Sequence, residues 1–242
     1  MKYFDEIISL LQEVAETQGD NIERAAEILA DAIEADHMIY VFGATHAGIL
    51  AQELFYRAGG LVPINPVLPP GLVTDVRPMT LTSRLERLPG LAAEVLAELP
   101  IETGDVFIVH SVSGRNAAAV EMAQGAKERG VFVIALTSLT YSQSVEPRGD
   151  GMPRLFEVAD LVLDNRAPVG DALITIPGLA QKVGPSSTVT GAALLNAMVV
   201  RVAELLQERT GDPPVFMSAN LDGGDAYNQR WLKHYRGRLT YL

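Results

Sequence analysis

The sequence predicts an α/β fold in which a mainly parallel sheet is covered by helices on both faces. Short apolar runs alternate with segments of helical period along most of the chain. The runs are apolar throughout rather than alternating, as in residues 106–109, which is typical of strands buried on both faces. At 242 residues, 48% of them hydrophobic, the chain suits one large domain with a sizeable core.

Two helices are expected in the first 36 residues. The first has an apolar stripe at helical spacing, formed by Tyr3, Ile7, Leu10, Leu11 and Val14. Asp20 or Asn21 is a suitable N-cap for the second helix. Its stripe is formed by Ile22, Ala26, Leu29, Ala30 and Ile33.

The other elements follow in order. Strands are expected at 38–42, 61–65, 106–110, 131–136 and 161–163, with an edge-like strand at 172–176. Helices are expected at 49–58, 91–99, 117–129 and 188–208, the last being the longest, and a basic helix follows Gly223-Gly224. Residues 66–90 are rich in Pro, Gly, Thr and Arg, which predicts a long ordered loop.

Composition excludes several classes of protein. The absence of cysteine excludes disulfides and thiolate metal sites, and a net charge of -11 argues against a nucleic-acid-binding surface. Asp5 and Glu6 stand where a signal peptide needs basic residues, and no run approaches the ~20 apolar residues that span a bilayer. We therefore expect a cytoplasmic protein that binds neither nucleic acid nor membrane.

The segment that follows residues 106–110 is the most informative one for function. Ser111-Val112-Ser113-Gly114-Arg115-Asn116 stands between an expected strand and an alanine-rich helix. The first N–H groups of a helix have no intrahelical partner, and the helix dipole places partial positive charge there. Two hydroxyls, a pliable glycine and an amide would surround that point with donors, so an anion of phosphate size fits it. The alternative is a capped helix start without a ligand.

Three further polar clusters lie at strand ends or at a helix start, namely residues 43–48, 137–138 and 186–188. In an open parallel sheet, ligands bind beyond the carboxyl ends of the strands. Thr45 stands where a dinucleotide fingerprint needs a glycine, and no Gly-Lys-Ser/Thr ending marks a P-loop. A tight turn without chemistry at 43–48 and pure helix capping at 186–188 stay open as alternatives.

Several residues could move protons. His46 lies in the turn at 43–48, whereas His110 ends a buried strand and is expected to be a satisfied interior histidine. Glu53 lies about 9 Å into its helix and is expected to contact the sheet edge or solvent. The segment with Asp225 and His234 is either a solvated tail or an arm that reaches a neighbouring subunit's cleft. No spacing resembles a zinc site, so neither metal nor cofactor is predicted.

The loop 111–116, the pair Thr137-Ser138 and the triplet 186–188 together resemble the sugar isomerase (SIS) domain family. The resemblance covers residues 35–242 and is nearest to poorly characterised bacterial members, through segments such as 53–60, 185–196 and 223–225. It implies a single SIS-type domain, with a five-stranded parallel sheet flanked by helices in three layers. The expected division is an N-terminal helical extension at 1–36 that packs on the core or on a partner subunit, the SIS domain at 37–212, and a C-terminal arm and helix at 213–242.

In this family a Ser-x-Ser-Gly-x-Ser/Thr loop holds the phosphate of a phosphosugar. The resemblance therefore implies these phosphate- and sugar-binding residues: Thr45, Ser111, Ser113, Gly114, Arg115, Asn116, Thr137, Ser138, Ser186, Ser187 and Thr188. Asn116 replaces the final hydroxyl of the loop. Thr45 and Ala47 depart from the Gly-x-Gly-x-Ser pattern of the family's first loop.

The resemblance implies an aldose–ketose isomerase of the phosphoheptose isomerase type that acts on a phosphorylated sugar. It also implies a homodimer or homotetramer with sites near the subunit interface. Isomerisation needs a base beside C1 and C2, for which His46 and His234 are the candidates, followed by Glu53 and Asp225. A non-catalytic sugar-phosphate sensor, and a lyase like N-acetylmuramic acid 6-phosphate etherase, are the alternatives.

Overall fold

A five-stranded parallel sheet forms the centre of the computed structural model, which describes residues 1–149 and 151–242. Its strands are β1 (Ile39–Gly43), β2 (Ile64–Val67), β3 (Val106–His110), β4 (Phe132–Thr137) and β5 (Leu161–Asp164), in the order β2-β1-β3-β4-β5. All neighbouring strands are parallel, so their carboxyl ends lie at one edge of the sheet. The predicted sheet is confirmed.

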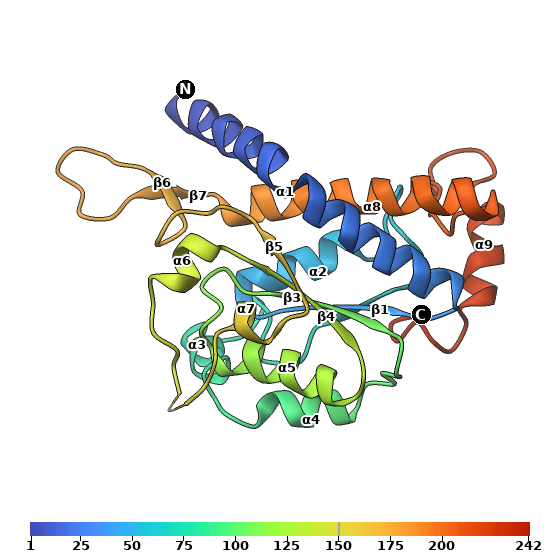
Figure 1. Ribbon diagram of the computed structural model, residues 1–242, viewed down its shortest axis with the longest axis horizontal. Coiled ribbons are helices and arrows are strands. Elements are labelled where there is room, and N and C mark those ends of the chain that lie inside the picture. Colours follow the sequence, from blue (N-terminus) through green and yellow to red (C-terminus); the bar gives the residue numbers. More distant parts are fainter. Residues whose placement is uncertain (150) are drawn as a thin grey trace.

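Helices cover both faces of the sheet, which confirms the three-layer arrangement (Figure 1). One face carries α1 (Lys2–Glu34), α2 (Ile49–Leu54) and α8 (Ser187–Thr210), and the other carries α4 (Leu91–Ala97), α5 (Ala117–Glu128) and α7 (Leu155–Val158). Because side chains alternate along a strand, Ile39 and Val41 belong to the first apolar core, whereas Tyr40 and Phe42 belong to the second.

The other elements of the described residues are η1 (Thr45–Gly48), α3 (Thr80–Leu85), α6 (Leu139–Gln143), α9 (Gly224–His234), β6 (Ala172–Ile174) and β7 (Val183–Pro185). The expected loop at 66–90 contains α3 and the end of β2. Neither α6 nor α7 is predicted, because helices of one turn or little more are too short to show a periodic pattern.

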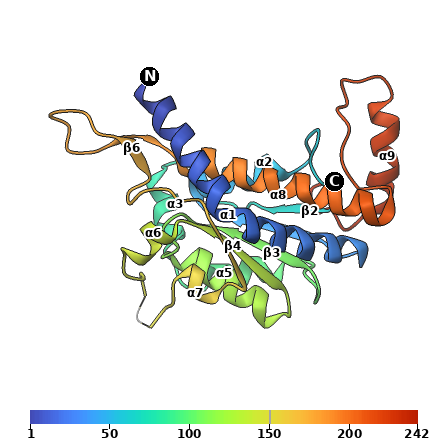
Figure 2. The same cartoon turned by 45° about the horizontal axis from the view of Figure 1, so that its top comes forward.

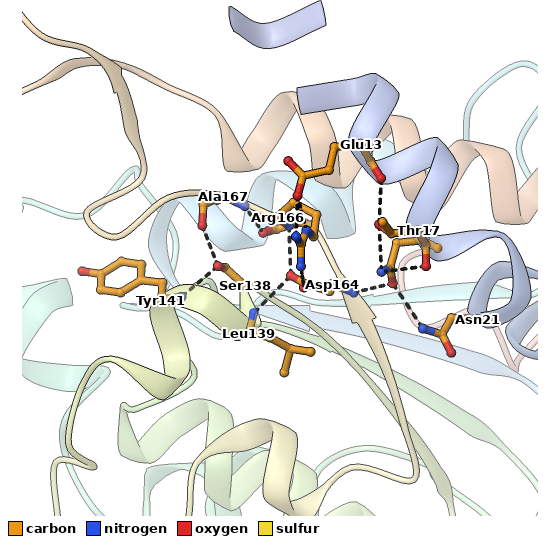
Figure 3. Close-up of polar contacts among 11 residues, drawn as sticks. Glu13, Thr17, Asn21, Ser138, Leu139, Tyr141, Asp164, Arg166 and Ala167 are labelled. Carbon is orange, nitrogen blue, oxygen red and sulfur yellow. Dashed lines mark hydrogen bonds and ion pairs between the residues drawn. The ribbon is translucent and has the colours of Figure 1, made fainter. Parts of the chain in front are cut away.

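The expectation of two N-terminal helices is wrong, since residues 2–34 form the single helix α1. The two apolar stripes are in phase, and Gln18, which is buried between them, accepts a hydrogen bond from the Asp164 amide of β5 at 2.9 Å. Asn21, expected as an N-cap, instead donates to Gln18 from within the helix at 3.3 Å. Arg166 adds an ion pair to Glu13, so α1 is tied to the carboxyl edge of the sheet (Figure 3).

Two expected boundaries around the second strand are also wrong. The helix expected at 49–58 ends at Leu54, because Phe55 is extended and the backbone of Gly59 donates to Phe216 O at 2.9 Å. The strand expected at 61–65 begins at Ile64, because Leu61 pairs with Val215 of the C-terminal segment instead. In both cases a distant segment takes the backbone groups that the local pattern assigned to the element.

The edge strand expected at 172–176 does not join the sheet. Residues 172–174 form β6, which pairs antiparallel with β7 in a separate two-stranded hairpin. This hairpin projects from the body beside the N-terminal end of α1 (Figures 1 and 2). Helix α8 is not the longest helix, since its 24 residues are fewer than the 33 of α1.

Helix α8 has the length and composition of a membrane-crossing helix, with a mean hydropathy of 1.6 in its most apolar window. The expectation that no stretch reaches this threshold is therefore wrong. Half of this most apolar stretch of α8 is buried inside the fold, in the core that α8 shares with α1 and α2. Burial of this kind accounts for the apolar composition.

The C-terminal arm packs on its own subunit rather than extending into solvent. Tyr235 and Leu239 are buried in the second core, and the side chains of His234 and Arg238 contact Asp36 at 3.0 and 2.8 Å. Three of its basic residues, Arg230, His234 and Arg238, thus contact carboxylates of the same chain. The division into extension, domain and arm stays a prediction.

Candidate functional site

The candidate site lies at the carboxyl edge of the sheet, between β1 and β3. The chain passes from β1 to β2 on one side and then returns to β3 on the other side of β1, so the strand order reverses at this point. Loops after two such strands diverge and leave a crevice, which is where open α/β sheets bind ligands. Gly43 pairs with His110, so the turn η1 and the loop 111–116 begin side by side.

The loop 111–116 is held by its own side chains and by distant backbone. Ser111 Oγ accepts from the Gly114 amide at 3.2 Å, and Gly114 O accepts from the Leu155 amide at 2.8 Å. Gly114 has φ +58°, and a Cβ placed on it would lie 2.8 Å from Ser142 Oγ. Only glycine fits there without displacing its neighbours.

Several donors at the start of α5 remain open. Within the described part of the chain, the amides of Ser113, Arg115, Asn116 and Ala117 have no acceptor. Asn116 is the N-cap residue but makes no side-chain cap, so a capped helix start does not describe this loop. The N–H groups point out of a helix terminus that carries partial positive charge.

The second helix terminus at this edge is already filled by an internal anion. The carboxylate of Asp171 accepts from the amides of Ser186 (3.1 Å) and Ser187 (2.7 Å) at the start of α8. It also accepts from the Ser186 hydroxyl at 3.0 Å and the Ser187 hydroxyl at 2.6 Å. The expected helix start is therefore capped by a residue outside the helix, and Thr188 stays half-buried beside it. Sequence reasoning missed Asp171.

Thr137 and Ser138 are brought to the same edge, but their hydroxyls are engaged. Thr137 Oγ1 donates to Val112 O at 3.0 Å, and Ser138 Oγ donates to Ala167 O at 2.6 Å while it caps α6. Both residues are fully buried. Either hydroxyl would have to give up its present hydrogen bond before it could contact a ligand. The role of these two residues in binding stays a prediction.

The four predicted catalytic residues do not lie together. His46 is exposed in η1, next to Thr45, which has φ +57°. Glu53 of α2 pairs with Arg57 and accepts from Asn196 of α8 at 3.2 Å, so it faces α8 rather than the sheet edge while its side chain stays 32% exposed to solvent, as expected. Sequence reasoning missed this partner, because Asn196 is 143 residues away.

His234 and Asp225 belong to α9, which lies at the far end of α8 from the β6–β7 hairpin (Figure 1). His234 is bound there to Asp36, three residues before the amino end of β1. Within one subunit neither reaches the loop 111–116. Their participation in a site of a neighbouring subunit stays a prediction.

His110 is buried as expected, but it is not fully satisfied. Its Nδ1 lies 3.0 Å from Ala47 O, a carbonyl that can only accept, so Nδ1 carries the proton. Its Nε2 is buried and has no partner among the described residues. Burial lowers the pKa of His110 to about 4, although Ala47 O and the nearby Asp171 act in the opposite direction. The imidazole is therefore neutral at pH 7.

A groove of about 460 Å³ lies elsewhere, outside β2, and is lined by apolar residues such as Pro69, Pro70, Leu91 and Val95. Its only ionisable carboxylates are Glu94 and Glu98. It lacks the converging donors that an anionic ligand requires, whereas the carboxyl edge has them. The site is therefore assigned by donor chemistry and not by cavity volume.

The model of the SIS domain matches residues 2–138. A UPF0309 protein of Shouchella clausii is 45% identical over 241 residues, covering 100% of this chain and 98% of the relative. Phosphoheptose isomerase GmhA of Neisseria gonorrhoeae has a similar structure, with a TM-score of 0.56, 20% identity and coverage of 84% of this chain and 96% of the other.

The Vibrio vulnificus NanR protein, in its complex with ManNAc-6P, is also similar in structure. The TM-score is 0.51 at 16% identity, and the match covers 98% of this chain and 69% of NanR. At these identities the two solved structures show a shared fold, while the family model and the relative from Shouchella clausii show membership. The chain belongs to the SIS domain family.

Proposed function

We propose that the protein binds a phosphorylated sugar with its phosphate at the start of α5, and that it interconverts the aldose and ketose forms of that sugar. One observation carries the binding site. Two long helices, α5 and α8, begin at the carboxyl edge; the N-terminus of α8 is filled by the Asp171 carboxylate, whereas that of α5 keeps open amides. A dianionic phosphate would bind to α5 as Asp171 binds to α8.

The groups available to the phosphate are the open amides of residues 113 and 115–117 and the half-buried Ser113 hydroxyl. The Gly114 amide is bonded to Ser111 Oγ, so it shapes the loop rather than binding the ligand. Charge-assisted hydrogen bonds of this kind contribute about 1.5–3 kcal/mol each. The ligand class agrees with the structural neighbours, since GmhA is a phosphoheptose isomerase and NanR is in a complex with ManNAc-6P.

For the reaction, His46 is the proton-transfer group that the geometry favours. It lies on the turn that follows β1, next to the loop that follows β3, and it has no partner among the described residues. An imidazole there could carry a proton between C1 and C2 through an enediol. Glu53, in contrast, is engaged by Arg57 and Asn196.

Replacement of Gly114 by alanine tests the binding site. The added Cβ would approach Ser142 Oγ at a positive φ, which distorts the loop and should weaken binding of a hexose 6-phosphate at least about tenfold. Gly211→Ala is the matched control, because Gly211 also has a positive φ but has no atom within 4 Å of its Cβ position. Calorimetric titration measures the affinity of both variants for the hexose 6-phosphate. Wild-type affinity in Gly114→Ala would place the phosphate elsewhere.

Turnover tests the reaction separately. His46→Asn should abolish interconversion of a sugar phosphate, followed by NMR, while thermal stability and phosphate binding persist because His46 is exposed. If His46→Ala and His234→Ala both leave turnover intact, the proton-transfer assignment fails. Binding without turnover across a panel of sugar phosphates would instead indicate a non-catalytic sensor.

We also propose that the protein is a cytoplasmic homodimer or homotetramer. Apolar side chains are exposed on the projecting end of α1 and on the β6–β7 hairpin, including Phe4 (56%), Ile8 (52%) and Leu179 (48%). These two elements project side by side, as both views show (Figures 1 and 2). A second copy would remove this surface from water, at about 2 kcal/mol for each large side chain.

The double variant Phe4→Ser/Ile8→Ser should therefore shift the protein toward the monomer in light scattering coupled to size exclusion. Leu221→Ser is the control, since Leu221 is 60% exposed on the C-terminal arm at the other end. An unchanged mass in the double variant would contradict an interface through α1.

A further inference from the structure

Three arginines converge beside the phosphate loop. The backbone brings their segments together, because the Arg148 amide donates to Arg115 O and the Ala118 amide donates to Glu86 O, each at 3.1 Å. The Arg148 guanidinium lies within electrostatic range of those of Arg87 and Arg115. Burial and these two positive charges lower its pKa. Arg87 follows the end of α3, Arg115 lies in the loop 111–116, and Arg148 lies in the segment after α6.

None of these three arginines forms an ion pair among the residues that the structure describes. In the part of the chain that the structure describes, seven arginines form ion pairs, namely Arg57, Arg154, Arg166, Arg201, Arg209, Arg230 and Arg238. Arg24, Arg77, Arg84, Arg129 and Arg236 form none, but the structure does not bring them together beside the loop 111–116. The carboxyl of Glu86 lies near these arginines; burial raises its pKa, while the charge of Arg87, the Asn116 side chain and the charge of Arg148 act in the opposite direction.

Two polar atoms of the same loop also lack partners among the described residues. Arg115 Nε and Asn116 Oδ1 are both buried and unpartnered. A buried polar atom without a partner costs free energy, and such atoms cluster where a ligand completes the structure. The Arg115 donor therefore supports a ligand group on the side of the loop that faces Arg148.

We propose that the ligand carries a second anionic group, a phosphate or a carboxylate, which Arg87 and Arg148 bind together with Arg115 beside the phosphate at α5. The inference rests on the proposed function. A single phosphate is already provided for by the open amides and the Ser113 hydroxyl. Three guanidiniums without an ion-pair partner among the described residues attract an anion, and their planar forks suit phosphate and carboxylate oxygens. The substrate class is thus a sugar bisphosphate or a phosphorylated sugar acid.

Calorimetric titration of the whole chain with three probes tests this inference. The probes are a hexose 6-phosphate, the corresponding 1,6-bisphosphate and 6-phosphogluconate, at about 0.15 M salt so that long-range attraction is screened. The bisphosphate, the phosphogluconate or both should bind at least about tenfold more tightly than the monophosphate. Whichever of the two gains more identifies the second group as phosphate or carboxylate.

The variant Arg87→Gln/Arg148→Gln should remove this preference and change the monophosphate affinity by less than about threefold. Arg24→Gln/Arg236→Gln is the matched control, since it removes the same charge from exposed arginines elsewhere and should keep the preference. Equal affinity for all three probes in the wild type, or a preference that survives in Arg87→Gln/Arg148→Gln, would overturn the inference.

Failure of the proposed function would give a different set of titration results. In that case Gly114→Ala would leave the affinity for the monophosphate unchanged, or none of the three probes would bind, and both proposals would fall. If Gly114→Ala weakens every probe but the two arginines make no difference, the phosphate site stands and only the second anionic group is rejected.

Discussion

Replacing Asp171 by alanine is expected to lower the free energy of unfolding by about 2–4 kcal/mol, because the change removes an internal anion from the start of α8. The carboxylate accepts from two amides and two hydroxyls of Ser186 and Ser187. Without it, these buried donors lose their partners, and the hairpin base loses its attachment to α8. Urea unfolding of the wild type and the variant measures the effect.

Asp171→Asn is the matched control. Asparagine keeps one carbonyl oxygen and tolerates the positive φ of 58° at this position, so the loss should be intermediate. Sulfate should stabilise Asp171→Ala more than the wild type, because the emptied helix terminus becomes an anion site. A variant as stable as the wild type would show that α8 does not depend on this cap.

Acidification from pH 6.5 to pH 4 is expected to destabilise the protein by about 3 kcal/mol through His110 alone. Burial lowers the pKa of His110 from 6.5 to about 4 in the folded state. As the pH falls through this window, the unfolded chain takes up a proton that the folded imidazole refuses, so folding becomes less favourable. Above pH 6.5 both states are neutral at this residue and the contribution is fully retained.

The difference between the wild type and His110→Asn isolates this contribution from that of the carboxylates. An asparagine amide can still donate to Ala47 O in place of Nδ1, but it does not titrate. The unfolding free energy of His110→Asn should therefore depend less on pH between 6.5 and 4. His46→Asn, which changes an exposed histidine, should keep the wild-type profile. Parallel profiles for wild type and His110→Asn would contradict the buried neutral state.

The sheet was predictable because each of its strands is buried on both faces. The strand at 106–110 lies where its continuous apolar run predicted it. The alternation of strands with helices predicted a parallel sheet between two layers of helices. Helix α1 was not predictable as one element, because Gln18 and Gly19 look like a break. Gln18 becomes a core residue only through its bond to Asp164, 146 residues away.

The candidate site divides in the same way. The loop 111–116 was recognised from a local pattern of strand, hydroxyls, glycine and helix. Asp171, Asn196 and Arg148 were missed, because each acts through a partner that the fold brings near rather than through a local motif. His110 was placed correctly in the core, but its unpartnered Nε2 depends on which atoms surround it in three dimensions.

The sequence by itself determined the periodic elements and the chemistry of the loop, since both depend on residues that are neighbours along the chain. Tertiary structure decided which helix terminus stays open, which strand leaves the sheet, and which arginines converge. Those outcomes depend on competition between distant groups for the same donors, acceptors and charges. Asp171 fills α8 and leaves α5 open, and no pattern within either segment contains that fact.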